Sequence, residues 1–527
     1  MLIASNFADK NAMPVAFHRI ASVLSGALVC GALQAQTYAP PAFADSGRAA
    51  RVRAALPEID KMYGALAASA HLPGLVYGVV LDGKLIHSRA LGLANLERKL
   101  PVTSSTQFRI ASMTKSFVAM AVMKLRDEGK LRLDDPVGDY LPELRSLRLP
   151  TLDSPALTLR HLMTMNTGLP EDNPWGDRQM ELDNAALTRF VSGGLSFSNV
   201  PGQGFEYSNL GFVLLGKVVT KVAGMRYQDY IAREILLPLG MKDTLWEYSK
   251  ASPERFALGY RWEHEQWKVE PILHDGDAAA MGGLITTMDD FARYVAFHLG
   301  AWPARDEADS GPLRRATVRE MQQPRVFAIL DGKATLADGK TPNPKVSFYG
   351  YGLSWLRDSG GVVIVGHSGG LPGYGSQYRF APDHGVALIA FSNLRYAPVY
   401  GPTSKALAEL IERAALAPRA VAPSPTLLAR QRQVADLVQG WDAALGAAIT
   451  ADNFFLDRSR ADWIDEAKRL LAPIGKVRSV DAIEAENQLR GSFTLTGERG
   501  QLRIAFTLSP EREPKLQELT ITAVAKP

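Results

Sequence analysis

Ser112 and Lys115 form an S-x-x-K motif, which places a hydroxyl and an amine three residues apart. The motif immediately precedes SFVAMAVMKL, whose apolar spacing predicts a helix from Ser116 to Glu128 that Gly129 ends. Residues i and i+3 share one face of a helix, so the Lys115 amine can reach the Ser112 hydroxyl. Burial lowers the pKa of a lysine, and a neutral amine can take the serine proton. The spacing therefore predicts an activated serine nucleophile.

A second motif, Tyr207-Ser208-Asn209, lies in GFEYSNLGFVLLG. A tyrosine hydroxyl near a buried lysine can be held as a phenolate, or it can shuttle a proton between nucleophile and leaving group. The Asn209 amide can bond a substrate carbonyl while it helps to fix the lysine. Taken alone, each motif also fits a structural role, as a helix-capping serine with a solvated lysine, or a core tyrosine with a turn asparagine.

The third stretch, VVIVGHSGGLPGYG, contains G-x-S-x-G and raises Ser368 as an alternative nucleophile on an elbow. An elbow needs a helix after the serine, whereas Pro and Gly follow here and a second strand comes next. Strand, turn and strand instead place His367 at a sheet edge facing a pocket. The N–H of Gly370 could then form an oxyanion hole with the N–H of Ser112. Alone, His367 equally fits a turn histidine with satisfied hydrogen bonds.

The order S-x-x-K, Y-x-N and H-x-G resembles the serine β-lactamase and penicillin-binding-protein superfamily. Its class C-like branch, which includes class C β-lactamases, D-amino-acid-specific peptidases and carboxylesterases, is the most similar. FRIASMTKSF, LTLRHLMTMNTGLP, PGQGFEYSNLGFVLLGKVV and GHSGGLPGYGSQYRFAPDHGVALIAFSN carry the resemblance, which extends from about Leu72 to Ala415. It implies an α+β fold of the β-lactamase/DD-peptidase type, with an antiparallel sheet flanked by helices and a helical subdomain.

The resemblance also implies roles for the motif residues. Ser112 would form an acyl-enzyme that water hydrolyses, and Lys115 and Tyr207 would move its proton. His367 would be the fourth catalytic residue. The residues expected to contact substrate are Asn209, Ser368, Gly369 and Gly370. No cofactor and no metal are expected, since the nine histidines form no metal-binding pattern such as H-E-x-x-H.

One departure from the family pattern bears on the substrate. Many relatives have Lys-Thr-Gly as the third motif, whereas this chain has His367-Ser368-Gly369. A lysine holds a substrate carboxylate permanently, and a histidine does so only when protonated. We therefore expect a peptidase or esterase, acting on peptides with D-residues or on linearised non-ribosomal peptides, with weak β-lactamase activity as an alternative. A non-catalytic penicillin-recognising sensor or binding protein is the alternative from another class.

Changes in composition and the positions of turn-forming residues divide the 527 residues into segments. Residues 1–44 read as a signal peptide, with an apolar core and Ala42-Phe43-Ala44 as its cleavage site, which predicts a periplasmic or secreted protein. Residues 45–416 form the hydrolase domain and residues 417–425 a Pro/Ala linker. Residues 426–527 are predicted to be a small α+β domain, similar to NTF2 or cystatin modules, in which QLRIAFTL alternates as a strand.

Charge and cysteine content exclude several classes of function. The net charge of +4 is spread along the chain without a basic run, so we expect no nucleic-acid partner. No segment after the leader is long and apolar enough to span a membrane. The single cysteine, Cys30, lies in the leader, where we interpret it as an apolar filler rather than a lipid-attachment site. A mature chain without cysteine excludes thiolate chemistry, and the expected partner is a small-molecule or peptide substrate.

Overall fold

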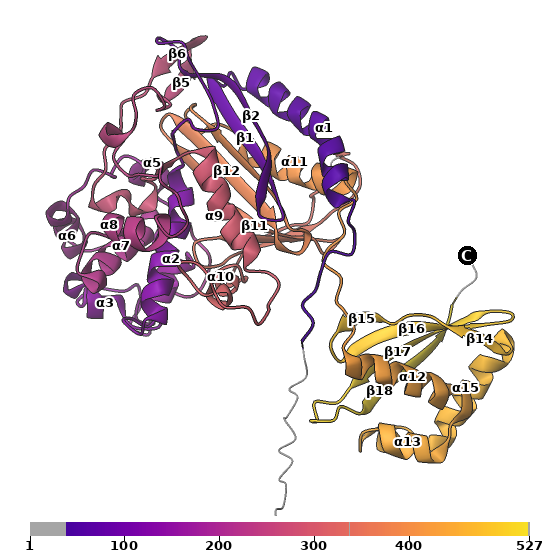
Figure 1. The fold of residues 1–527 in the computed structure, drawn as a ribbon. Helices are drawn as coiled ribbons and strands as arrows, with labels where there is room; N and C mark the ends of the chain where they lie inside the picture. Colours follow the sequence, from indigo (N-terminus) through magenta and orange to yellow (C-terminus); the bar gives the residue numbers. More distant parts are fainter. Residues whose placement is uncertain (1–37, 337, 525–527) are drawn as a thin grey trace, which may run out of the picture. The chain divides into compact units, whose positions relative to one another are not determined.

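The central sheet of the larger domain brings distant motifs together. The computed structural model describes residues 38–336 and 338–524. Within them, nine antiparallel strands form one sheet (Figure 1). In spatial order they are β3 (Leu100–Pro101), β2 (Lys84–Asn95), β1 (Gly74–Leu81), β13 (Val386–Ser392), β12 (Tyr374–Ala381), β11 (Val363–Leu371), β10 (Ser354–Asp358), β9 (Lys345–Tyr349) and β8 (Val326–Asp331).

The β1–β2 hairpin turns at Asp82 and Gly83, as the Asp-Gly pair predicts. Both central residues adopt positive φ, which an Asp-Gly pair tolerates at low cost. Residues around Ser368 form strand β11, a short turn and strand β12, with no helix among the described residues that follow directly. The strand–turn–strand prediction is confirmed, and the elbow alternative lacks its helix.

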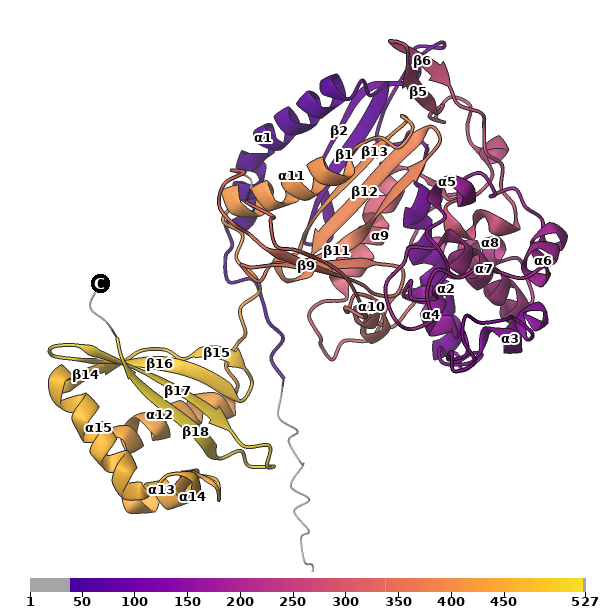
Figure 2. The same ribbon diagram turned by 180° about the vertical axis from the view of Figure 1, so that it is seen from behind.

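Two helices cover one face of this sheet. Figure 2 shows α1 (Arg48–Ser69) and α11 (Tyr400–Arg413) lying across β1, β12 and β13. Their apolar residues pack with the alternate sheet residues Leu75, Tyr77 and Leu388 in one core. The alternation follows from the period of two in a strand, which sends the neighbouring residues to the other face.

The other face of the sheet carries the helices that surround the motifs. Val76, Val80 and Phe391 belong to a second, larger core with residues of α2 (Thr114–Asp127), α7 (Asn209–Ala223) and α9 (Met288–Gly300). The remaining helices on this side are α3 (Val137–Tyr140), α4 (Leu159–Met163), α5 (Asn173–Gly176), α6 (Asn184–Ser192), α8 (Tyr227–Ile231) and α10 (Arg315–Met321). Two short two-stranded sheets complete the domain, β4 (Phe108–Arg109) with β7 (Ile285–Thr286), and β5 (Tyr260–Glu263) with β6 (Gln266–Val269).

The predicted leader is only partly described. Residues 1–37, including Cys30, lie outside the described residues. The ring of Phe43, inside the predicted cleavage motif, contacts the guanidinium groups of Arg48 and Arg419, whose Cζ atoms lie 3.6 and 4.4 Å from its centroid. Ala42 also pairs with Ala420 in a β-bridge. Cleavage after Ala44 would remove these contacts.

The C-terminal segment has a core of its own. Its helices are α12 (Pro425–Gly440), α13 (Ala443–Ile449), α14 (Phe454–Asp457) and α15 (Arg460–Ile474). An antiparallel sheet follows, made of β14 (Val477–Val480), β15 (Glu484–Asn487), β16 (Arg490–Gly497), β17 (Gln501–Leu508) and β18 (Leu516–Ala523). Leu502, Ile504, Phe506 and Leu508 are all buried, as the alternation in QLRIAFTL predicts. The likeness to NTF2 or cystatin modules stays a prediction.

Candidate active site

Ser112 lies in a 3₁₀ turn, η1 (Ala111–Met113), directly before α2. This turn is held against the sheet, because the Ser376 hydroxyl donates to the Ile110 carbonyl at 2.7 Å. Gly369 allows the close approach, since an ideal Cβ there would lie only 2.2 Å from the same carbonyl oxygen. Sheet packing therefore fixes the position of Ser112 relative to the third motif.

The Lys115 amine is completely buried and makes three polar contacts. Its Nζ lies 2.9 Å from Ser112 Oγ, 2.6 Å from Asn209 Oδ1 and 2.6 Å from the carbonyl oxygen of Met281. A neutral amine has two N–H donors and one lone pair. The amide oxygen and the carbonyl can only accept, so they take both donors. The lone pair is left for the Ser112 hydroxyl, which is the geometry of a general base.

Electrostatics favour this neutral state. Burial lowers the pKa of Lys115 from its usual 10.5 to about 7, while the Asp177 and Asp172 carboxylates oppose the shift. Burial also raises the pKa of Asp177 to about 6, against the attraction of Lys115. Lys115 and Asp177 therefore titrate as a coupled pair near neutral pH. Neither aspartate was singled out in the sequence, because nothing in its local pattern marks it.

Asn209 is fixed by the start of helix α7. Asp172 accepts hydrogen bonds from the N–H groups of Asn209 and Leu210 at 2.6 and 2.9 Å, and Ser208 caps the helix. The Asn209 side-chain amide donates to Asn173 Oδ1 at 3.0 Å, which leaves its oxygen for Lys115. In this structure Asn209 contacts the lysine directly, as the sequence interpretation proposed.

The ring of Tyr207 lies close to the amine of Lys115. Lys115 Nζ is 5.0 Å from the centroid of its ring, and the tyrosine lines the cleft beside Ser112. Burial raises the pKa of Tyr207 far above its usual 10, and the carboxylates of Asp177 and Asp172 raise it further. The phenolate alternative is therefore disfavoured, and the side chain is a phenol that can pass a proton.

His367 differs from its predicted role. The side chain is buried and is not among the residues that line the cleft in the described chain. Its Nδ1 lies 2.6 Å from the carbonyl oxygen of Ser368, and its Nε2 lies 2.8 Å from the hydroxyl of Tyr349. Burial and nearby Lys115 lower the pKa of His367 to about 3, so the ring is neutral. The expectation of a basic group facing the pocket is corrected.

The neutral ring has only one arrangement of protons that satisfies both partners. The Ser368 carbonyl can only accept, so Nδ1 carries the hydrogen and donates to it. Nε2 then accepts from the Tyr349 hydroxyl. These two hydrogen bonds fix the peptide plane between Ser368 and Gly369. Tyr349 is a site residue that the sequence did not reveal, because its partner is 18 residues away and on a different strand.

The cleft itself has a volume of about 500 Å³. Its lining contains Ser112 together with Ser368, Gly369 and Gly370, and their roles toward a substrate stay predictions. The full set is Ser112, Glu171, Asn173, Asp177, Phe205, Glu206, Tyr207, Ser368, Gly369, Gly370 and Tyr396. The pairing of the Gly370 and Ser112 N–H groups as an oxyanion hole stays a prediction.

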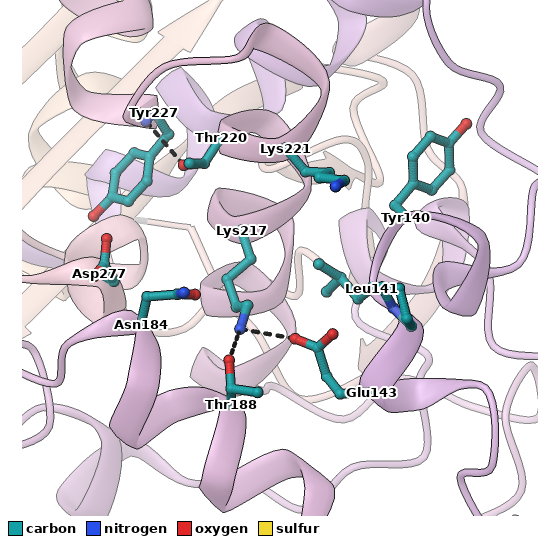
Figure 3. Close-up of a pocket in the computed structure, with 11 residues that line it drawn as sticks. Tyr140, Leu141, Glu143, Asn184, Thr188, Lys217, Thr220, Lys221, Tyr227 and Asp277 are labelled. Atoms are coloured by element: carbon teal, nitrogen blue, oxygen red, sulfur yellow. Dashed lines mark hydrogen bonds and ion pairs between the residues drawn. The ribbon is translucent and has the colours of Figure 1, made fainter.

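A second hollow, of about 370 Å³, lies beside helix α7 (Figure 3). At its centre Lys217 binds Glu143 at 2.8 Å and Thr188 at 2.7 Å. Asn184 and Lys221 also line it, and none of its lining residues in the described part of the chain is a serine or cysteine. The charge of Lys217 is balanced by Glu143, and this hollow has no counterpart of Ser112.

Two searches of the described residues bear on other functions. No helix there is long and apolar enough to cross a bilayer. No group of three or more His, Cys, Asp or Glu side chains in residues 38–336 and 338–524 is arranged to hold a metal ion.

The chain is similar in sequence to a penicillin-binding protein and to protein flp. Penicillin-binding protein 4* of Bacillus subtilis (strain 168) is 26% identical over 328 residues, which cover 59% of this chain and 66% of that protein. Protein flp of Staphylococcus aureus (strain MW2) is 26% identical over 335 residues, which cover 62% of this chain and 61% of that protein. The chain thus spans less than two thirds of the length of these two curated relatives.

Solved structures share the fold. The octameric penicillin-binding protein homologue from Pyrococcus abyssi has a TM-score of 0.54 at 22% identity, covering 88% of this chain and 93% of its own. A penicillin-binding protein from Bacillus halodurans has a TM-score of 0.50 at 23% identity, covering 67% and 98%. The β-lactamase/penicillin-binding-protein fold predicted from the motifs is confirmed, whereas the class C-like branch is not resolved. The Beta-lactamase family model matches residues 59–412, more than half of the chain, and the chain belongs to that family.

Proposed function

We propose that this member of the Beta-lactamase family is a serine hydrolase that forms an acyl-enzyme on Ser112. Most proteins of the family are serine acyltransferases or hydrolases. The observation that supports the proposal best is the set of three contacts around Lys115. Two acceptors take its N–H groups and leave the lone pair for the Ser112 hydroxyl, 2.9 Å away.

The reaction follows from this geometry. Lys115 takes the Ser112 proton while Oγ bonds to the substrate carbonyl carbon, and the carbonyl electron pair moves to its oxygen. Collapse of this tetrahedral intermediate expels the leaving group, which receives the proton by way of the Tyr207 hydroxyl. Water then attacks the acyl carbon and gives one proton to Lys115. When this second tetrahedral intermediate collapses, Lys115 returns that proton to Ser112 Oγ, and the acid leaves.

The substrate class is an ester or an amide, with peptides that contain D-residues and linearised non-ribosomal peptides as candidates. A neutral His367 supports this choice over β-lactams, because it offers no permanent charge for their carboxylate. Export to the periplasm, predicted from the leader, belongs to the same proposal. Fractionation of cells that express the full chain tests that part.

The test of the nucleophile compares the purified wild type with Ser112→Ala and Ser368→Ala. The substrates are p-nitrophenyl acetate and butyrate, nitrocefin, and the D- and L-alanine p-nitroanilides. We expect Ser112→Ala to lose turnover and fluorophosphonate labelling, and Ser368→Ala to keep the label on Ser112. Full activity of Ser112→Ala would exclude the proposal and return Ser368 as the nucleophile. A wild type that is labelled without turning over any substrate would favour the non-catalytic binding protein.

A further inference from the structure

The cleft around Ser112 is lined by acids and aromatic rings. Glu171, Asp177 and Glu206 supply three carboxylates. Phe205, Tyr207 and Tyr396 supply three rings. Carboxylates attract a cation through its charge, and the faces of aromatic rings attract it through their quadrupole. Both kinds of lining residue are suited to a positively charged group.

No side chain in this lining balances those acids. None of its residues in the described chain is a lysine, arginine or histidine. Lys115 is buried behind Ser112, and its nitrogen is occupied by Asn209 and the Met281 carbonyl. His367 is neutral, and both of its ring nitrogens are bonded. The cleft offers a substrate carboxylate no partner of opposite charge.

Asp177 has an unused acceptor in the cleft. Its residue is only 4% exposed, and the Tyr396 hydroxyl donates to Oδ2 at 3.0 Å. Among the described residues, no hydrogen-bond donor reaches the other oxygen, Oδ1. A carboxylate that is nearly buried costs free energy unless its oxygens are paired. Oδ1 is not among the fully buried polar atoms of the described residues, so it is accessible from the cleft, where a cation would pair with it next to the ring of Tyr396.

We propose that the preferred acyl donor carries a positive charge, such as an ammonium group, which binds between Asp177, Glu171 and the Tyr396 ring while its carbonyl lies at Ser112. This inference rests on the proposed function, because it assigns the substrate class of that same cleft. Glu206 contributes to the negative field, although its Oε2 already accepts from Ser198 and Asn199 and its Oε1 accepts from the backbone N–H of Glu171.

Three p-nitrophenyl esters that differ in charge provide the test. The 4-(trimethylammonio)butyrate ester is cationic, the 5,5-dimethylhexanoate ester is its neutral isostere, and the hemiglutarate ester is anionic. Each kcat/KM, measured at pH 8 and low salt, is divided by the rate constant of the same ester with hydroxide. We expect a preference for the cation over its isostere on the order of tenfold, which declines as salt is added, with the anion slowest.

Two variants test which residues cause the preference for the cationic ester. Asp177→Asn and Glu171→Gln should each lower the ratio of cation to neutral isostere several-fold. Glu171 is exposed, so its variant remains informative even if Asp177→Asn does not fold. Glu97→Gln makes the same charge change at an exposed residue that does not line the cleft, and should leave the ratio unchanged.

The outcomes separate the two proposals. Absence of turnover of these three esters and of every substrate named for the nucleophile test would remove the proposed function itself. Turnover in which the neutral isostere equals or exceeds the cation would overturn the cation preference and leave the hydrolase standing. A cation preference that persists in both acid variants would overturn the assigned residues.

Discussion

The ionisation of Lys115 should control the rate of acylation. The lysine acts as a base only when neutral, and its pKa is lowered from 10.5 to about 7 by burial. With this value, roughly nine tenths of the amine is neutral at pH 8 and about one tenth at pH 6. The wild-type kcat/KM should therefore fall about tenfold between pH 8 and pH 6.

Asp177→Asn tests the cause of this pH dependence. The Asp177 carboxylate is the largest charge that raises the pKa of Lys115, so its removal should move the acid limb to lower pH by about one unit. At pH 6 the variant would then keep about half of its own plateau, whereas the wild type keeps about a tenth.

The assay is kcat/KM for p-nitrophenyl butyrate from pH 5.5 to 9, corrected for the ionisation of p-nitrophenol. Because this ester is neutral, a preference of the cleft for charged substrates does not affect the comparison between wild type and variant. Glu97→Gln is the control for a general change in charge. An acid limb near pH 10, or one that Asp177→Asn leaves in place, would refute the view that a buried neutral lysine is the base.

Three further outcomes are expected. Tyr349→Phe leaves Nε2 of His367 without its hydrogen-bond donor, which should lower the free energy of unfolding by about 1–3 kcal/mol and reduce kcat/KM. A variant with the same free energy of unfolding and the same kcat/KM as the wild type would contradict the fixed tautomer of His367. Gly369→Ala places a Cβ 2.2 Å from a backbone carbonyl oxygen and should reduce kcat/KM about a hundredfold in a folded protein. Gly204→Ala is the control, because a Cβ there meets no neighbouring atom, and its kcat/KM should match that of the wild type. Burial lowers the pKa of His298 from 6.5 to about 3, so below pH 6.5 the unfolded chain binds a proton that the folded chain does not. The pKa of His367 is lowered to about 3 in the same way, so denaturant melts should show about 2 kcal/mol of stability lost from each of these two residues between pH 7 and pH 5, and equal stability at both values would contradict it.

Local sequence was sufficient for the elements and contacts of short range. Asp82 and Gly83 predict the β1–β2 hairpin, and the apolar spacing after Ser112 predicts α2. Ser112 and Lys115 meet because three residues of helix join them, so their contact needs no other part of the chain. The order of the three motifs was enough to identify the family and its fold.

Only the tertiary structure decided the charges in the site. His367 is neutral because Tyr349, on another strand, and burial in the core fix its ring. Asp177 approaches Lys115 across 62 residues of sequence, and neither a motif nor a periodicity marks it. A pKa depends on desolvation and on neighbouring charges in space. The sequence therefore determined which groups could react, and the packing of distant segments determined their protonation and the charge of the cleft that surrounds them.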